Sequence, residues 1–163
     1  MTRHATSPEA PSLPLEIPPD IREGRRISAG TENRYYFERY LSQWRMMEQM
    51  LRVSGFHGGR HVIDFGCFVG GWSWVLSRRY EAVTALDVDD TVLALGKRFA
   101  QHHGFSNLEM KTIAPDVLAA LPPADGILCV GTFQVMPAAD LYAFFSMVRR
   151  TLVPGGLLLC NSA

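Results

Sequence analysis

The sequence predicts an α/β fold in which a mainly parallel β-sheet is covered by helices on both faces. Two observations predict it. Short apolar runs alternate with stretches whose apolar residues recur every three or four positions, as in strands and amphipathic helices. The first apolar run also ends in a glycine-rich loop that leads straight into a helical stretch. Strands that alternate with helices in this way form parallel sheets through right-handed crossovers.

The elements can be placed one after another along the chain. The expected strands are the apolar runs over residues 61–65, 82–86, 108–113, 126–130 and 157–160. The expected helices lie over residues 71–79, 91–103, 115–121 and 137–152. Asp90 can cap the second of these helices, and a Pro-Gly-Gly sequence follows the fourth. Five runs separated by helices predict a sheet that is buried on both faces.

The first 56 residues depart from this alternation. Residues 1–30 predict an extended or disordered arm, because they are rich in proline and polar residues. Its prolines are Pro8, Pro11, Pro14, Pro18 and Pro19. Residues 31–56 predict an N-terminal helix, since large apolar side chains recur at helical spacing. These side chains belong to Phe37, Tyr40, Leu41, Trp44, Met47, Met50 and Leu51. Residues 57–163 then form a single α/β domain.

Composition excludes several classes of protein. The 163 residues are 47% hydrophobic and 20% charged, as in ordinary globular domains. Sixteen basic and sixteen acidic residues cancel, so no global field favours nucleic acid or an anionic membrane. Three cysteines without a C-x-x-C pair argue against a disulfide framework and a zinc site. No apolar run reaches the roughly 18 residues of a membrane span. We therefore expect a cytoplasmic protein with no metal.

The loop after the first strand is the expected ligand site, because parallel sheets bind ligands beyond the carboxyl ends of their strands. It contains Gly66, Gly70 and Gly71, which let the backbone approach a ligand, and it opens a helix N-terminus. Asp87 follows about 20 residues after Gly66, where an acidic side chain can accept hydrogen bonds from ribose hydroxyls. The alternative role for Asp87 is to cap the next helix, a role for which Asp89 and Asp90 compete.

Phe68 narrows the choice of ligand. In the dinucleotide pattern G-x-G-x-x-G, the second glycine lets the backbone meet the pyrophosphate. Phe68 holds that place here, which disfavours NAD and FAD. An adenosine cofactor without a pyrophosphate is less affected.

Four segments resemble the motifs of class I S-adenosylmethionine-dependent methyltransferases. Residues 62–70, VIDFGCFVG, resemble the first motif, V-L-D-x-G-C-G-x-G. Residues 84–89 resemble the second acidic motif, residues 107–110 the entry to the third strand, and residues 152–158 the L-x-P-G-G turn. The resemblance covers about residues 60–161 and implies a doubly wound, Rossmann-like sheet that binds S-adenosylmethionine within residues 57–163.

The resemblance also assigns cofactor-binding positions. It places Asp64, Gly66 and Gly70 around the methionine end, Asp87 at the ribose and Val88, Ile113 and Ala114 around the adenine. Cys67 and Phe68 of the same loop are also expected to bind the cofactor. The resemblance places Val130 and Gly131 near the sulfonium and its methyl group. Tyr36 and Gln134 are expected to face a substrate. No histidine falls in the loop after the fourth strand, so no catalytic base is assigned.

The sequence departs from the family pattern in two further places. Ala114 stands where many relatives carry an acidic residue that accepts the adenine amino group, and Asp116 is two places further on. The sequence also stops just after the fifth strand, where the family sheet adds an antiparallel pair of strands. We expect that pair to be lacking and the fifth strand to be covered by a second copy or a partner chain, unless the chain is a fragment.

These observations favour a methyltransferase that acts on a small molecule. The alternative is a noncatalytic subunit with the same fold that binds an adenosine cofactor or serves as a scaffold. A third hypothesis, an RNA ribose methyltransferase, rests on residues 70–73, GGWS. It lacks the lysine pair of that group, because Lys97 and Lys111 are not in matching places, and the neutral net charge argues against RNA.

Overall fold

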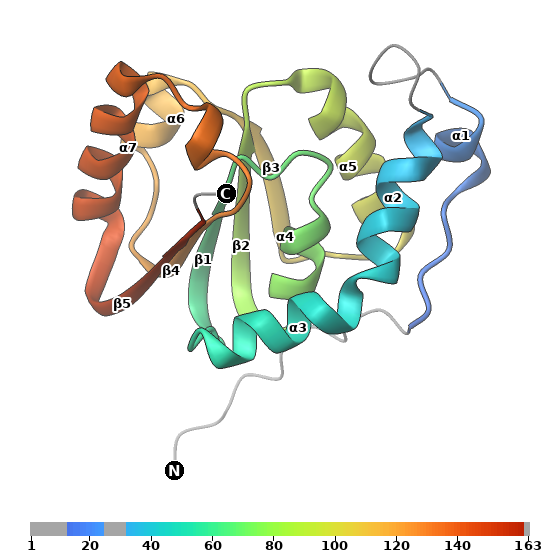
Figure 1. Cartoon of the computed structure of the whole chain (residues 1–163), viewed down its shortest axis with the longest axis horizontal. Coiled ribbons are helices and arrows are strands. Elements are labelled where there is room, and N and C mark those ends of the chain that lie inside the picture. Colours follow the sequence, from blue (N-terminus) through green and yellow to red (C-terminus); the bar gives the residue numbers. More distant parts are fainter. Residues whose placement is uncertain (1–12, 25–31, 162–163) are drawn as a thin grey trace.

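The computed structural model describes residues 13–24 and 32–161 and contains one five-stranded sheet (Figure 1). All neighbouring strands are parallel, in the order β3-β2-β1-β4-β5. The strands are β1 (Gly59–Phe65), β2 (Tyr80–Asp87), β3 (Leu108–Thr112), β4 (Ala124–Cys129) and β5 (Leu152–Cys160). The predicted fold class is confirmed. The chain order reverses between β1 and β4, which is where ligands bind in such sheets.

Helices cover both faces of this sheet (Figure 1). One face carries α1 (Pro19–Arg22), α2 (Asn33–Ser42), α3 (Trp44–Val53), α4 (Gly71–Leu76) and α5 (Asp90–His102). The other carries α6 (Pro115–Ala119) and α7 (Ala138–Thr151), and a short 3-10 helix, η1 (Phe133–Val135), precedes α7. Each face has its own apolar core, the first built around stacked Trp74 and Phe99 and the second around Phe65 and Phe144.

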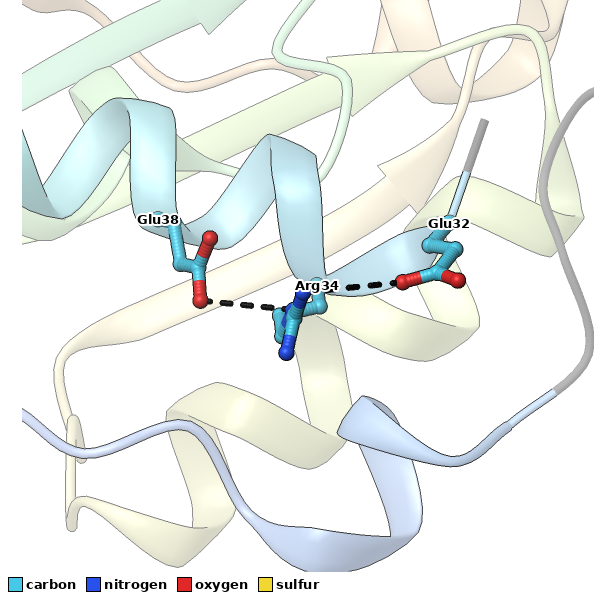
Figure 2. Close-up of polar contacts among 3 residues, drawn as sticks. All are labelled: Glu32, Arg34 and Glu38. Atoms are coloured by element: carbon cyan, nitrogen blue, oxygen red, sulfur yellow. Dashed lines mark ion pairs between the residues drawn. The ribbon is translucent and has the colours of Figure 1, made fainter. Parts of the chain in front are cut away.

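The N-terminal helical region is two helices, where the sequence predicted one. The chain turns at Gln43, between α2 and α3. On the exposed side of α2, Arg34 lies between Glu32 and Glu38 at 3.9 and 3.4 Å (Figure 2). Such surface pairs contribute only about 0.3–0.5 kcal/mol each. The fully buried ring of Phe37 stacks on Trp74 at 5.6 Å, so apolar packing holds α2 against the domain.

Part of the proline-rich arm belongs to the core. Within residues 13–24, the side chains of Leu15, Ile17 and Ile21 are buried in the first apolar cluster. The sequence led us to expect no helix here, yet Pro19 opens the single turn α1, a position that proline tolerates. Residues 1–12 and 25–31 lie outside the described part. The division into residues 1–30, 31–56 and 57–163 stays a prediction.

Several boundaries differ from the sequence-based ones because strand pairing decides them. The fifth strand begins directly after α7 at Leu152, which pairs with Ala124, whereas the sequence placed its start at residue 157. The next pair joins Leu157 to Gly126, so residues 153–156 form a bulge that holds the Pro-Gly-Gly sequence. In the described part of the chain, no helix is both long and apolar enough to cross a membrane.

Candidate functional site

A pocket of about 390 Å³ opens at the carboxyl ends of the strands, a size typical of small-molecule sites. It lies where β1 and β4 are neighbours and where the chain order reverses. Its lining residues are Phe65, Gly66, Asp87, Val88, Ile113, Leu118, Thr132, Val135, Met136, Asp140, Ala143 and Phe144. The wall is mostly apolar, and Asp87 and Asp140 are its ionisable side chains.

The glycine-rich loop after β1 is anchored to the end of β2. The backbone N–H groups of Gly66 and Cys67 both donate to the carbonyl of Leu86, at 2.7 and 2.9 Å. Gly66 has a φ of 77° and Gly70, which caps α4, has a φ of 94°. Both values favour glycine, which explains why the turn from strand to helix needs this residue type.

Asp87, the last residue of β2, lines the pocket. Its Oδ2 accepts a hydrogen bond from the Phe68 N–H at 2.7 Å, and its Oδ1 accepts one from the Asp89 N–H at 3.1 Å. The cap of α5 is Asp89, whose side chain accepts from the Thr91 N–H at 2.7 Å. The capping role proposed for Asp87, and the one expected of Asp90, therefore fall to Asp89. Each oxygen of Asp87 keeps room for a further donor.

Phe68 turns away from the pocket. Its φ of 54° is left-handed, and its ring packs edge-on against Tyr36 of α2, with ring centroids 4.8 Å apart. The ring is not part of the pocket lining. Its N–H group is already bound to Asp87. A pyrophosphate would have to compete with that carboxylate for the loop N–H, which agrees with the sequence argument against NAD and FAD.

Asp64 lies buried beneath the loop. Ser73 Oγ donates to its Oδ2 at 2.5 Å. Burial raises the pKa of Asp64 to about 7, the Ser73 hydrogen bond counteracts this, and the charge of Asp87 adds to it. Burial together with the charges of Asp64 and Asp87 raises the pKa of the Cys67 thiol well above its usual range. Cys67 is therefore a protonated, packed residue and not an activated nucleophile.

The opposite wall comes from the loop after β4 and from α7. Thr132 Oγ1 donates to the Gly66 carbonyl at 3.2 Å, and a Cβ atom on Gly66 would collide with the Thr132 side chain. The Gly131 N–H donates to Asn161 Oδ1 at 2.7 Å. The loop after β4 is thus held between the glycine-rich loop and the residue that follows β5.

The expected cofactor residues fall into two groups. Gly66, Asp87, Val88 and Ile113 line the pocket together. The others lie around it: Asp64, Cys67, Phe68 and Gly70 in and under the first loop, Ala114 in an adjoining hollow, and Val130 and Gly131 after β4. Tyr36 packs on Phe68 and Gln134 lies on η1, and neither is among the lining residues. The assigned roles of all these residues stay predictions.

Sequence reasoning missed most of the second wall. Its members are Thr132, Val135, Met136, Asp140, Ala143 and Phe144, and the lining residue Leu118 of α6 was missed as well. Thr132 adjoins the expected residue Gly131, so a wider window around that position would have found it. The amphipathic pattern over residues 137–152 predicted the helix, but it does not tell which of its first residues reach over the strand ends.

A family model described as a methyltransferase domain matches residues 62–156, more than half of the chain. The chain belongs to this family. The matched part runs from β1 to the bulge in β5 and includes all five strands at least in part.

Named relatives agree with this assignment. The malonyl-[acyl-carrier protein] O-methyltransferase of Serratia marcescens is 29% identical over 117 residues, which make up 71% of this chain and 43% of the relative. The chain therefore spans less than half the length of that relative.

Two solved structures share the fold. One is precorrin 8w decarboxylase of Methanobacterium thermoautotrophicum, with a TM-score of 0.61 and 21% identity over 73% of this chain and 62% of that one. The other is a DhpI-SAH complex, with a TM-score of 0.59 and 22% identity over 79% of this chain and 62% of that one. The expected family is confirmed, and S-adenosylmethionine is the cofactor of that family.

Proposed function

We propose that this domain binds S-adenosylmethionine between the two walls of the pocket and serves methyl transfer to a small-molecule acceptor. The observation that carries the proposal is the carboxylate of Asp87. It is held by the Phe68 N–H in the wall of a mostly apolar pocket at the reversal of the strand order. A ribose needs such an acceptor, and a flat apolar base needs such walls.

The pocket supports an extended adenosine ligand. Asp87 would receive the ribose hydroxyls, and Val88, Ile113 and Leu118 would contact the adenine. Gly66 and the buried Asp64 would lie toward the methionine end, where the carboxylate of Asp64 can balance the ammonium group. The pKa of Asp64, which burial raises to about 7, would then fall when the ligand binds.

Methyl transfer requires little covalent chemistry from the residues of this domain. Bound S-adenosylmethionine supplies an electrophilic methyl group on a sulfonium. The residues of this chain orient it and exclude water, which is a proximity effect. Gly131 and Val130 would face the methyl group, and Tyr36 and Gln134 would approach an acceptor. No base is assigned, so we propose an acceptor that is nucleophilic without help or is deprotonated by a group outside the pocket.

The acceptor class rests on charge and on likeness. The net charge is zero, and the two ionisable side chains of the pocket are both acidic. This does not favour a polyanion such as RNA. The name of the Serratia marcescens relative gives its acceptor as a malonyl group, a small group on an acyl-carrier protein. A small-molecule acceptor agrees with both observations.

Calorimetric titration with S-adenosylmethionine tests the proposal. We expect Asp87→Ala to weaken binding by about tenfold to a hundredfold, because hydrogen bonds to a charged group contribute roughly 1.5–3 kcal/mol. Asp89→Ala is the matched control, since it removes the cap of α5 without touching the pocket. An unmodified domain that shows neither heat nor a thermal shift at millimolar cofactor would support the noncatalytic scaffold instead.

The edge of β5 and the cellular setting are part of the same proposal. Leu157 and Leu158 on β5 are 38% and 37% exposed. We propose that a second copy or a partner chain covers this edge, and sedimentation of the domain would show whether it self-associates.

The three cysteines are free, which agrees with a reduced, cytoplasmic setting.

A further inference from the structure

The pocket contains a second carboxylate that the proposed function does not use. Asp140 lies in the first turn of α7 and lines the pocket with Asp87. Among the described residues, nothing forms a hydrogen bond or ion pair with the Asp140 side chain. Asp87, in contrast, accepts hydrogen bonds from Phe68 and Asp89.

Asp140 stands at the end of the pocket near β3. Asp140, Ile113, Leu118 and Ala143 also line an adjoining hollow of about 420 Å³, which includes Ala114 but neither Gly66 nor Asp87. Asp140 therefore lies at the border between the two spaces, beside the residues that follow β3. A planar base that extends from a ribose at Asp87 along Val88 and Ile113 would meet it there.

The other acidic side chain near this position points elsewhere. Asp116, two residues after Ala114, lines a separate hollow together with His61 and Glu81. It is not among the residues of the pocket. Ala114 has no polar side chain to offer. Asp140 is therefore the carboxylate placed to meet the outer edge of a base in the pocket.

We propose that Asp140 accepts a hydrogen bond from the exocyclic amino group of the cofactor's adenine and selects adenine over hypoxanthine. This inference rests on the proposed binding of S-adenosylmethionine. An ionised carboxylate only accepts hydrogen bonds. The amino group of adenine donates, whereas hypoxanthine presents a carbonyl oxygen at the same place. Two acceptors that face one another cannot pair, so the hypoxanthine ligand lacks the hydrogen bond that the adenine ligand makes with Asp140, whose exposed carboxylate then stays hydrated.

A purely structural role gives a different expectation. An aspartate in the first turn of a helix stabilises the helix through its dipole. That role would change the stability of α7 and would weaken any ligand to the same degree. Only a direct contact makes the effect depend on the group at position 6 of the purine.

The experiment compares two ligands, S-adenosylhomocysteine and S-inosylhomocysteine, by calorimetry. We expect the unmodified domain to prefer the adenine ligand by about tenfold, because the Asp140 carboxylate is exposed to solvent. Asp140→Ala should weaken the adenine ligand by about tenfold and leave the hypoxanthine ligand unchanged or tighter, so that the preference collapses. Asp140→Asn should also lose most of the preference, because its amide can accept or donate. The control Asp116→Asn should keep the preference in full.

The possible outcomes distinguish a failure of the proposed role of Asp140 from a failure of the proposed cofactor site. If the unmodified domain binds neither ligand, the proposed cofactor site is wrong. If it binds the adenine ligand while Asp140→Ala weakens both ligands equally or neither, the cofactor site stands and the role of Asp140 is overturned. Thermal unfolding of each variant shows whether α7 remains folded.

Discussion

The two walls of the pocket are built in different ways. The wall from β1 and β2 is tied together by short hydrogen bonds within a largely buried loop, such as Gly66 to Leu86 and Phe68 to Asp87. The wall from the loop after β4 and from α7 is more exposed and is joined to its surroundings by Thr132 to Gly66 and Gly131 to Asn161. The first wall is therefore buried and held by its own hydrogen bonds, whereas the second wall is more exposed and contacts the first through Thr132.

This difference predicts which wall should tolerate amino-acid substitutions better. A residue in the first wall has fixed neighbours above and below, so a new atom there meets backbone or packed side chains. A residue in the second wall often has open space beside it. The same substitution should therefore destabilise the fold more in the first wall than in the second.

The largest effect is expected for Gly66→Ala compared with Gly131→Ala. Both glycines have a φ near 77°, at 77° and 76°, which costs alanine about 1–2 kcal/mol. An added Cβ on Gly66 collides with Thr132, whereas nothing in residues 13–24 and 32–161 lies within 4 Å of one on Gly131. Overpacking should add about 1–3 kcal/mol at Gly66 alone. Urea denaturation of the two variants measures the difference.

A third variant identifies the cause. Gly66→Ala combined with Thr132→Gly removes the collision but keeps the strained φ, so it should recover part of the lost free energy of unfolding. Equal losses for Gly66→Ala and Gly131→Ala would mean that the two walls do not differ in the way described.

The next effect concerns Asp64 under the first wall. Its pKa is about 7 in the folded domain and 3.8 in an unfolded chain. As the pH rises between these values, the unfolded chain releases its proton first, so folding loses stability on the order of a few kcal/mol. Asp64→Asn should abolish this loss and become more stable than the unmodified domain near pH 7. Urea denaturation from about pH 4 to about pH 8 follows the difference between the two proteins.

Ser73→Ala gives the opposite control. It removes the hydrogen bond that lowers the pKa of Asp64, so stability near neutral pH should fall further. A difference between Asp64→Asn and the unmodified domain that is flat with pH would contradict the raised pKa.

The smallest effect is expected for Phe68→Gly. Glycine relieves the left-handed φ of 54° but removes the ring contact with Tyr36, and each change is worth about 1 kcal/mol. Since the ring does not line the pocket, affinity for S-adenosylmethionine should stay the same or improve. Tyr36→Leu is the matched variant, because it removes the ring contact and keeps the strain. A clear loss of affinity in Phe68→Gly alone would show that the side chain forms part of the site.

Local patterns were sufficient for the first wall. The glycines at positions 66 and 70 are visible in the sequence because a turn from strand to helix requires positive φ. Asp87 is visible because it ends the second apolar run, which forms β2. The five strands and the order of elements follow for the same reason, since alternation and turn residues are short-range signals.

Pairing and packing decided what the sequence alone did not show. The sequence predicted that residues 13–24 belong to an extended arm, but their side chains Leu15, Ile17 and Ile21 are buried. Local patterns did not show this, because the apolar partners of these side chains lie far along the chain. The fifth strand starts early because Ala124 offers a partner to Leu152.

By itself, the sequence determined the fold class, the family and the wall that carries Asp87. Only the tertiary structure placed Thr132 over Gly66 and turned Phe68 toward Tyr36. It also brought Asp140 to the lining of the pocket, whereas Asp116 lines another hollow. The physical reason is the same in each case. The first set depends on backbone conformations within a few residues, whereas the second depends on contacts between segments that meet only when the sheet is assembled.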